Sequence, residues 1–127
     1  MTKNFSEEEF NCMDGSMMPI NVYHNMIKVA NQLQTLRNYI GKPITVNSAY
    51  RSEEYNKVIG GVKNSQHIMG RAADIVVKGM TPLEVHTTIE LLIEKGDMLQ
   101  GGLGLYDTFV HYDIRGTRAR WDYQKKL

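Results

Sequence analysis

The sequence predicts an α+β domain in which a small antiparallel sheet packs with helices on one side. A long segment between residues 19 and 41 repeats apolar residues at alternating spacings of four and three, which is typical of a helix with one buried face. Short β-prone runs at 44–46, 73–77 and 109–114 predict strands. With 127 residues the chain has the length of one domain, and we expect that domain to span residues 1–127.

Capping residues predict where the other helices begin. The segment Ser6–Glu9 is a capping box that starts a short helix, and Ser52 caps another that runs to about residue 59. The segment Thr81–Glu84 is a second capping box, and the helix that follows it ends at Gly96. Apolar residues predict the buried face of that helix: Leu83, Ile89, Leu92 and Ile93.

The last third of the chain predicts a β-hairpin. The runs 101–106 and 109–114 are separated by a two-residue turn. Apolar and polar residues alternate along the second run, so we expect His111 and Asp113 on the same face of the strand. The segment 118–121 is expected to cover the end of the hairpin.

Composition and charge argue against several classes of partner. Fifteen basic and fourteen acidic residues give a net charge of +1, which does not favour nucleic acid. No apolar stretch approaches the length of a membrane span, and residues 1–10 lack the pattern of a signal peptide. We therefore expect synthesis in the cytoplasm and a monomer without nucleic-acid or membrane partners. The single cysteine, Cys12, excludes an internal disulfide and a cysteine-based zinc site.

Histidine and aspartate residues predict a metal site. His67 and Asp74 lie seven residues apart, Asp74 at the start of a predicted strand, and His111 lies on another strand. Two imidazoles and one carboxylate suit Zn²⁺ in an open catalytic site, with water in the fourth position. On spacing alone, the alternative to a metal site is a hydrogen-bonded histidine in the core beside an aspartate at the end of a strand. We interpret His86 and Glu90, one helical turn apart, as part of a solvated face.

Three segments of the chain resemble the zinc D-alanyl-D-alanine carboxypeptidases and related phage endolysins. They are SAYRS at 48–52, GGVKNSQHIMGRAAD at 60–74 and GGLGLYDTFVHYDIRG at 101–116. The resemblance runs from about Phe5 to Trp121. The pattern Ser-x-His-x-x-Gly-x-Ala-x-Asp within the second segment is highly specific. The resemblance implies the hedgehog/DD-peptidase fold.

The same resemblance implies roles for five residues. His67, Asp74 and His111 match the zinc ligands of the family. Arg51 matches an arginine that holds or polarises a substrate carbonyl or carboxylate, as a guanidinium fork can do. Ser65 matches a serine near the substrate. For Arg51 and Ser65 the alternatives are a surface salt bridge to a nearby glutamate and a turn-capping hydroxyl.

The position of the general base departs from the family's pattern. In the better-known carboxypeptidases an Asp or Glu lies three residues before the third zinc ligand, but Thr108 occupies that position here and cannot act as a base. We predict Asp113, which shares the strand face of His111, as the base or as the orienter of the zinc-bound water. Asp107, in the turn, is the alternative, and a weak or lost activity is a third interpretation.

The sequence thus favours a zinc metallopeptidase that hydrolyses peptide bonds in peptidoglycan stem peptides, as a carboxypeptidase or an endopeptidase. We expect it to act on the cell wall as a phage or prophage lysin or a virion-associated peptidase. The alternative is a non-catalytic, zinc-stabilised domain of the same fold that binds the cell wall or a protein. A nuclease or phosphatase is a weaker alternative, since zinc with arginine also suits phosphate but the chain has no basic stripe.

Overall fold

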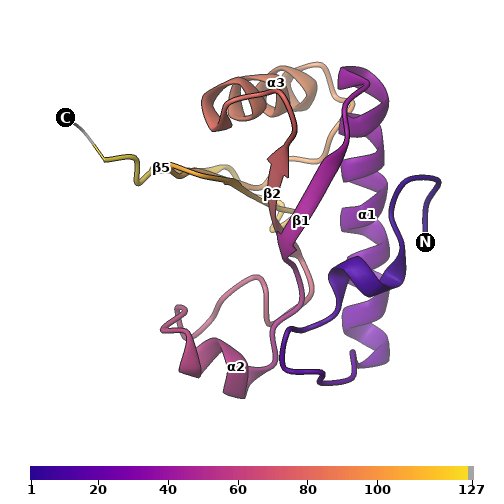
Figure 1. Cartoon of the computed structure of the whole chain (residues 1–127), viewed down its shortest axis with the longest axis vertical. Helices are drawn as coiled ribbons and strands as arrows, with labels where there is room; N and C mark the ends of the chain where they lie inside the picture. Colours follow the sequence, from indigo (N-terminus) through magenta and orange to yellow (C-terminus); the bar gives the residue numbers. More distant parts are fainter. Residues whose placement is uncertain (126–127) are drawn as a thin grey trace.

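The computed structural model describes residues 1–125 and has an α+β architecture with one five-stranded sheet (Figure 1). None of the helices in this range is both long and apolar enough to cross a membrane. In chain order the elements are η1 (Glu7–Phe10), α1 (Ile20–Ile40), β1 (Ile44–Ser48), α2 (Glu53–Val58), β2 (Ala72–Val77), α3 (Pro82–Glu94), β3 (Gly102–Leu105), β4 (Val110–Asp113) and β5 (Ala119–Asp122).

The sheet is mixed, which corrects the expectation of an antiparallel one. Its strand order is β1-β2-β4-β3-β5; the first four strands pair antiparallel, whereas β5 pairs parallel to β3. The predicted hairpin is present as β3 and β4, but the segment expected to cover its end forms β5 instead. Because β4 runs opposite to β3, a chain that turns back after β4 and passes to the far side of β3 runs parallel to β3.

The helices begin and end close to the predicted positions. Helix α1 spans Ile20–Ile40, and Gly41 ends it in the left-handed conformation with φ of 65°. In helix α3 the capping box of Thr81 and Glu84 is present. Leu83, however, is 55% exposed, and Val85 lies in the core with Ile89 and Leu92. The prediction for Leu83 was wrong because its position in the first turn points away from the sheet.

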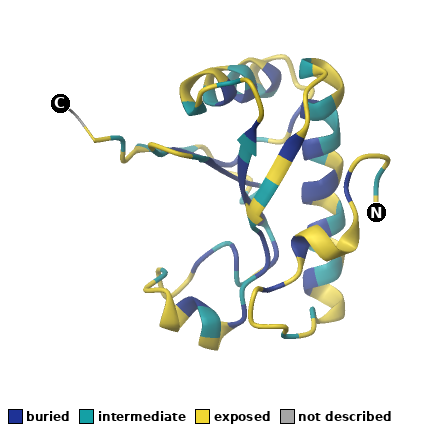
Figure 2. Cartoon of the chain, in the orientation of Figure 1, coloured by how far each residue is buried: buried dark blue, intermediate teal, exposed yellow. Residues whose placement is uncertain are grey.

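One face of the sheet is apolar and the other carries the polar residues. In β2 the side chains of Ala73, Ile75 and Val77 belong to the core, together with buried residues of α1 and α3. Figure 2 shows the buried positions of α1 on the side that faces the sheet. Successive side chains of a strand point to opposite faces, so Asp74 and His111 lie on the face away from this core.

Gly70 allows the segment before β2 to pack against α1. Its φ is 70°, and a Cβ atom at this position would lie 2.5 Å from Cγ1 and 2.8 Å from the carbonyl oxygen of Val22. Ala72 and Ala73, which follow, are fully buried. Gly70 therefore meets a steric requirement of the contact with α1, and Ala73 belongs to the core.

We predict that Gly70→Ala destabilises the protein by about 2–5 kcal/mol, since it combines a left-handed alanine with overpacking against Val22. Urea unfolding followed by circular dichroism measures the change. Gly79→Ala is the matched control: Gly79 has φ of 85° but nothing within 4 Å of the added Cβ. The control should lose only about 1–2 kcal/mol. Equal losses in the two variants would contradict the packing role of Gly70.

Candidate metal centre

A single row of residues crosses all five strands. Ser48 pairs with Asp74, Asp74 with His111, His111 with Gly104, and Gly104 with Trp121. Directly opposed residues on neighbouring strands have their Cβ atoms about 5 Å apart. The register of β2 against β4 therefore brings two candidate ligands from distant parts of the chain face to face.

Three ligand atoms converge at this row. Asp74 Oδ1 lies 3.3 Å from His67 Nε2 and 3.0 Å from His111 Nδ1. All three side chains are buried, and their ligand atoms lie within 4.8 Å of one another. The structure thus brings together the three residues that the sequence predicts as metal ligands.

Each ligand is held from behind by a second group. His67 Nδ1 lies 2.7 Å from the carbonyl oxygen of Ala49, so it carries the proton and leaves Nε2 as the free lone pair. His111 Nε2 lies 2.7 Å from Asp113 Oδ2, which leaves Nδ1 for a metal. Together, these contacts set the tautomers needed for coordination.

The electrostatics of the cluster favour a cation at its centre. Burial alone would raise the pKa of Asp74, but hydrogen bonds and the charges of His111 and His67 outweigh it and hold that pKa below its usual range. Burial opposes the charged form of His111, yet Asp113 and Asp74 outweigh it and raise the pKa of its imidazole. Two carboxylates therefore stabilise positive charge at His111, and a metal ion would take the place of the proton.

Asp113, the predicted base, lies behind His111 and does not line the cleft. It is 0% exposed and sits behind His111, and it accepts hydrogen bonds from the backbone N–H of Gly102 and from the backbone and guanidinium of Arg115. Burial would raise the pKa of Asp113, but the hydrogen bonds from His111, Arg115 and Gly102 outweigh it and lower that pKa. In this position Asp113 orients the His111 ring, which differs from both expected roles, general base and orienter of the zinc-bound water. Asp107 is exposed and accepts a hydrogen bond from the backbone of Lys125.

Arg51 lies in the site, but its donors are engaged with the protein. Nε donates to Ser48 Oγ (3.2 Å), Nη1 to Asn56 Oδ1 (3.3 Å) and Nη2 to Asp74 Oδ2 (3.3 Å). The bond to Asp74 fixes the oxygen that does not face the histidines. Arg51 therefore orients a candidate ligand, a role that the sequence did not indicate.

Ser65 also borders the site. Its hydroxyl accepts a hydrogen bond from the backbone N–H of His67 at 3.1 Å, as in the turn-capping alternative. The residue is buried and lines the cleft in front of the candidate ligands. Ser65 therefore acts as a turn cap, and it also lies close enough to the cleft to contact a substrate.

A cleft of about 360 Å³ opens onto the three ligands. One wall is aromatic: the rings of Tyr106 and Phe109 stack with centroids 4.3 Å apart, and Trp121 Nε1 donates to the Tyr106 hydroxyl at 3.0 Å. The Trp121 indole lies 5.1 Å from the His111 ring and crosses Gly104, where any Cβ would collide with it. The sequence did not indicate this wall, because Tyr106 and Phe109 stack across the turn of the hairpin and Trp121 reaches them from β5.

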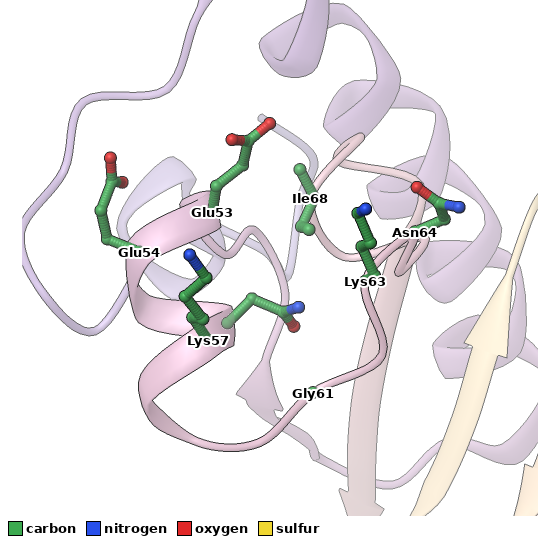
Figure 3. Close-up of a pocket in the computed structure, with 8 residues that line it drawn as sticks. Glu53, Glu54, Lys57, Gly61, Lys63, Asn64 and Ile68 are labelled. Atoms are coloured by element: carbon green, nitrogen blue, oxygen red, sulfur yellow. The ribbon is translucent and has the colours of Figure 1, made fainter.

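A larger hollow of about 640 Å³ lies between α2 and the segment 61–68, next to the cleft (Figure 3). Glu53, Glu54, Lys57 and Lys63 line it. These side chains have both signs of charge and are exposed, and the metal-ligand cluster is not among its lining residues. The chemistry therefore belongs to the smaller cleft.

The donor set fits a zinc ion. Two neutral imidazole nitrogens and one carboxylate oxygen are the ligands of an open zinc site, and the cleft provides access to the fourth position. The partners behind the ligands are a backbone carbonyl for His67, Arg51 for Asp74 and Asp113 for His111. Such partners orient metal ligands in known sites.

Comparisons with known proteins agree with this geometry. The family model described as Peptidase M15 matches residues 3–113. A zinc D-Ala-D-Ala carboxypeptidase from Streptomyces albus G is 49% identical over 45 residues. That match covers 35% of this chain and 18% of the relative, so the chain matches less than a fifth of the relative's length.

We predict that Asp113→Asn weakens zinc binding about 10- to 100-fold, because the amide no longer orients His111 as the carboxylate does. Competition between the protein and a zinc-sensitive dye measures the affinity. Asp107→Asn, which removes an equal charge from the turn, is the control and should leave the affinity unchanged. An Asp113→Asn protein with wild-type zinc affinity would contradict the orienting role.

Proposed function

The chain belongs to the peptidase M15 family, and we propose that it is a zinc-dependent peptidase that hydrolyses peptide bonds in peptidoglycan stem peptides. One observation carries the proposal: His67 Nε2, Asp74 Oδ1 and His111 Nδ1 converge at the base of an accessible cleft. The D-Ala-D-Ala carboxypeptidase relative supports the choice of substrate class.

Different residues of the cleft have different roles in such a reaction. When bound, zinc supplies Lewis acidity that polarises a carbonyl and acidifies a water molecule. His67 would bind through Nε2 and His111 through Nδ1, because Ala49 and Asp113 accept a hydrogen bond from the other nitrogen of each ring and so set the tautomer. Arg51 holds Asp74 in place and adds positive charge where a carbonyl oxygen becomes negative.

The aromatic wall and the ligands shape the environment of the scissile bond. Tyr106 and Phe109 exclude water from one side of the cleft, which strengthens electrostatic interactions within it. We propose that the zinc peptidase domain comprises residues 1–127 and works as a monomer without nucleic acid or membrane. The resemblance to endolysins supports the cell wall as its place of action, as a phage or prophage lysin or a virion-associated peptidase.

A second candidate function is a non-catalytic zinc-stabilised domain that binds cell-wall peptide or a protein. A specific observation favours it: among the described residues that line the cleft, Asp74 is the single carboxylate, and it is a candidate ligand. Neither Asp113 nor Asp107 lines the cleft. A proton acceptor of the expected type is thus absent from this lining.

Digestion of purified peptidoglycan should distinguish the two functions. We expect the zinc-loaded protein to release new amino termini, the chelated protein to release none, and added zinc to restore the release. Mass spectrometry of the products identifies the bond that is cut. His67→Ala is the control for site-dependent cleavage and should lose both zinc and activity. Binding to peptidoglycan without new amino termini in any condition would support the binding domain instead.

Zinc removal should also lower the melting temperature. A ligand that binds only the native state stabilises it by RT ln(1 + [L]/Kd), which is about 4 kcal/mol at a free zinc concentration 1,000 times Kd. Differential scanning calorimetry with and without chelator measures the shift. An unchanged melting temperature in the wild-type protein would count against the site, and the shift should be absent in His67→Ala.

A further inference from the structure

We propose that Arg115 binds a carboxylate of the peptide substrate and so selects anionic peptides. The inference rests on the proposed peptidase function. It deepens that function by assigning the anchor of the substrate to a residue outside the predicted set. The group that Arg115 would bind is a carboxylate, which lies either at the C-terminus of the peptide or on one of its side chains.

The guanidinium of Arg115 is held from behind and open in front. Nε lies 3.0 and 3.1 Å from the two oxygens of Asp113, and Nη2 lies 2.8 Å from Oδ2. Among the described residues, Nη1 has no acceptor. Asp113 is fully buried, whereas the Arg115 side chain is 30% exposed and lines the cleft. One edge of the fork, Nε and Nη2, thus binds Asp113, and Nη1 is left for a ligand in the cleft that Arg115 lines.

A second contact fixes the plane of the fork. The guanidinium carbon of Arg115 lies 5.4 Å from the centre of the Trp121 ring. An arginine that is already held by a carboxylate and an indole loses little conformational entropy when it binds a ligand. Arg115 is therefore preorganised for a planar anion, which a guanidinium binds in bidentate fashion.

Comparison of the two arginines of the cleft assigns the anchor to Arg115. All three guanidinium nitrogens of Arg51 already donate to protein acceptors, one of them on the ligand Asp74. Arg115 uses two of its three nitrogens, both toward Asp113. Arg51 thus serves the metal site, and Arg115 is the arginine of the cleft that keeps one nitrogen without an acceptor among the described residues.

The charge of the cleft favours the same class of ligand. Its charged lining residues are Arg51, Arg115 and Asp74, and Asp113 lies directly behind Arg115. With neutral histidines these four sum to zero, so a bound zinc ion would bring the site to +2. The aromatic wall of Tyr106 and Phe109 lowers the local dielectric constant, which strengthens attraction to an anion. The neighbouring hollow, with two glutamates and two lysines, has no such bias.

Binding of modified peptides to the zinc-loaded protein tests the proposal. Calorimetry would compare a synthetic stem pentapeptide that has free carboxylates with the same peptide amidated at its C-terminus and with one amidated at its side-chain carboxylate. We expect one of the two amides to bind about 10- to 100-fold more weakly, as for the loss of a charge-assisted hydrogen bond. The amide that weakens binding identifies the carboxylate that Arg115 contacts.

Variants assign that preference to Arg115. Arg115→Gln should bring the acid and the amide within about 3-fold of each other, and Arg115→Lys, which keeps the charge and loses the fork, should retain part of the difference. Arg118→Gln is the matched control, because Arg118 is exposed, pairs with Glu90 and does not line the cleft. It should keep the full preference. Zinc content is measured for every variant, since Arg115 also contacts Asp113.

The outcomes separate the inference from the proposed function. Equal binding of the acid and both amides by the wild-type protein would overturn the inference even if peptidoglycan is cleaved. A preference that survives in zinc-loaded Arg115→Gln would overturn it as well. If the wild-type protein prefers the acid and the preference is lost in Arg115→Gln, the inference holds, whether or not the protein cuts the peptide.

Discussion

The antiparallel register of β2 against β4 is the constraint on which the metal centre depends. It sets Asp74 opposite His111, while the turn before β2 brings His67 to the same carboxylate. A slip of one residue would move either side chain to the apolar face of the sheet. The core therefore does more than stabilise the fold: by burying Ala73, Ile75 and Tyr112 it fixes the register that builds the site.

Around this register the protein arranges a second layer of polar contacts. Ala49, Arg51 and Asp113 each hold one ligand from behind, and Arg115 in turn holds Asp113. Each buried carboxylate has a partner: Asp74 pairs with Arg51, and Asp113 pairs with His111 and Arg115. Both carboxylates are thus hydrogen-bonded, as burial of a charged group requires. The site is thus a network in which a change at one residue reaches the metal through its neighbour.

Local patterns in the sequence predicted the candidate ligands and most of the helices and strands. They did not predict how deeply Asp113 is buried or that residues 119–122 form a strand at the edge of the sheet. The spacing of His67 and Asp74, the alternation around His111 and the family resemblance together predicted a three-residue set, and the structure brings these residues together. Alternation gives the face of a strand but not the depth of a side chain, so Asp113 was expected in the cleft and lies behind it. Strand β5 escaped because its residues are only partly buried and it pairs along a single edge.

The position of Trp121 against His111 has a consequence for how the protein is made. The ligands lie on segments separated by up to 44 residues, and the indole beside the third ligand comes from β5, the last described strand along the chain. A nascent chain on the ribosome holds His67 and Asp74 well before β4 and β5 emerge. The three-ligand set is therefore complete only after β4 has been synthesised, and the indole beside it is added only with β5.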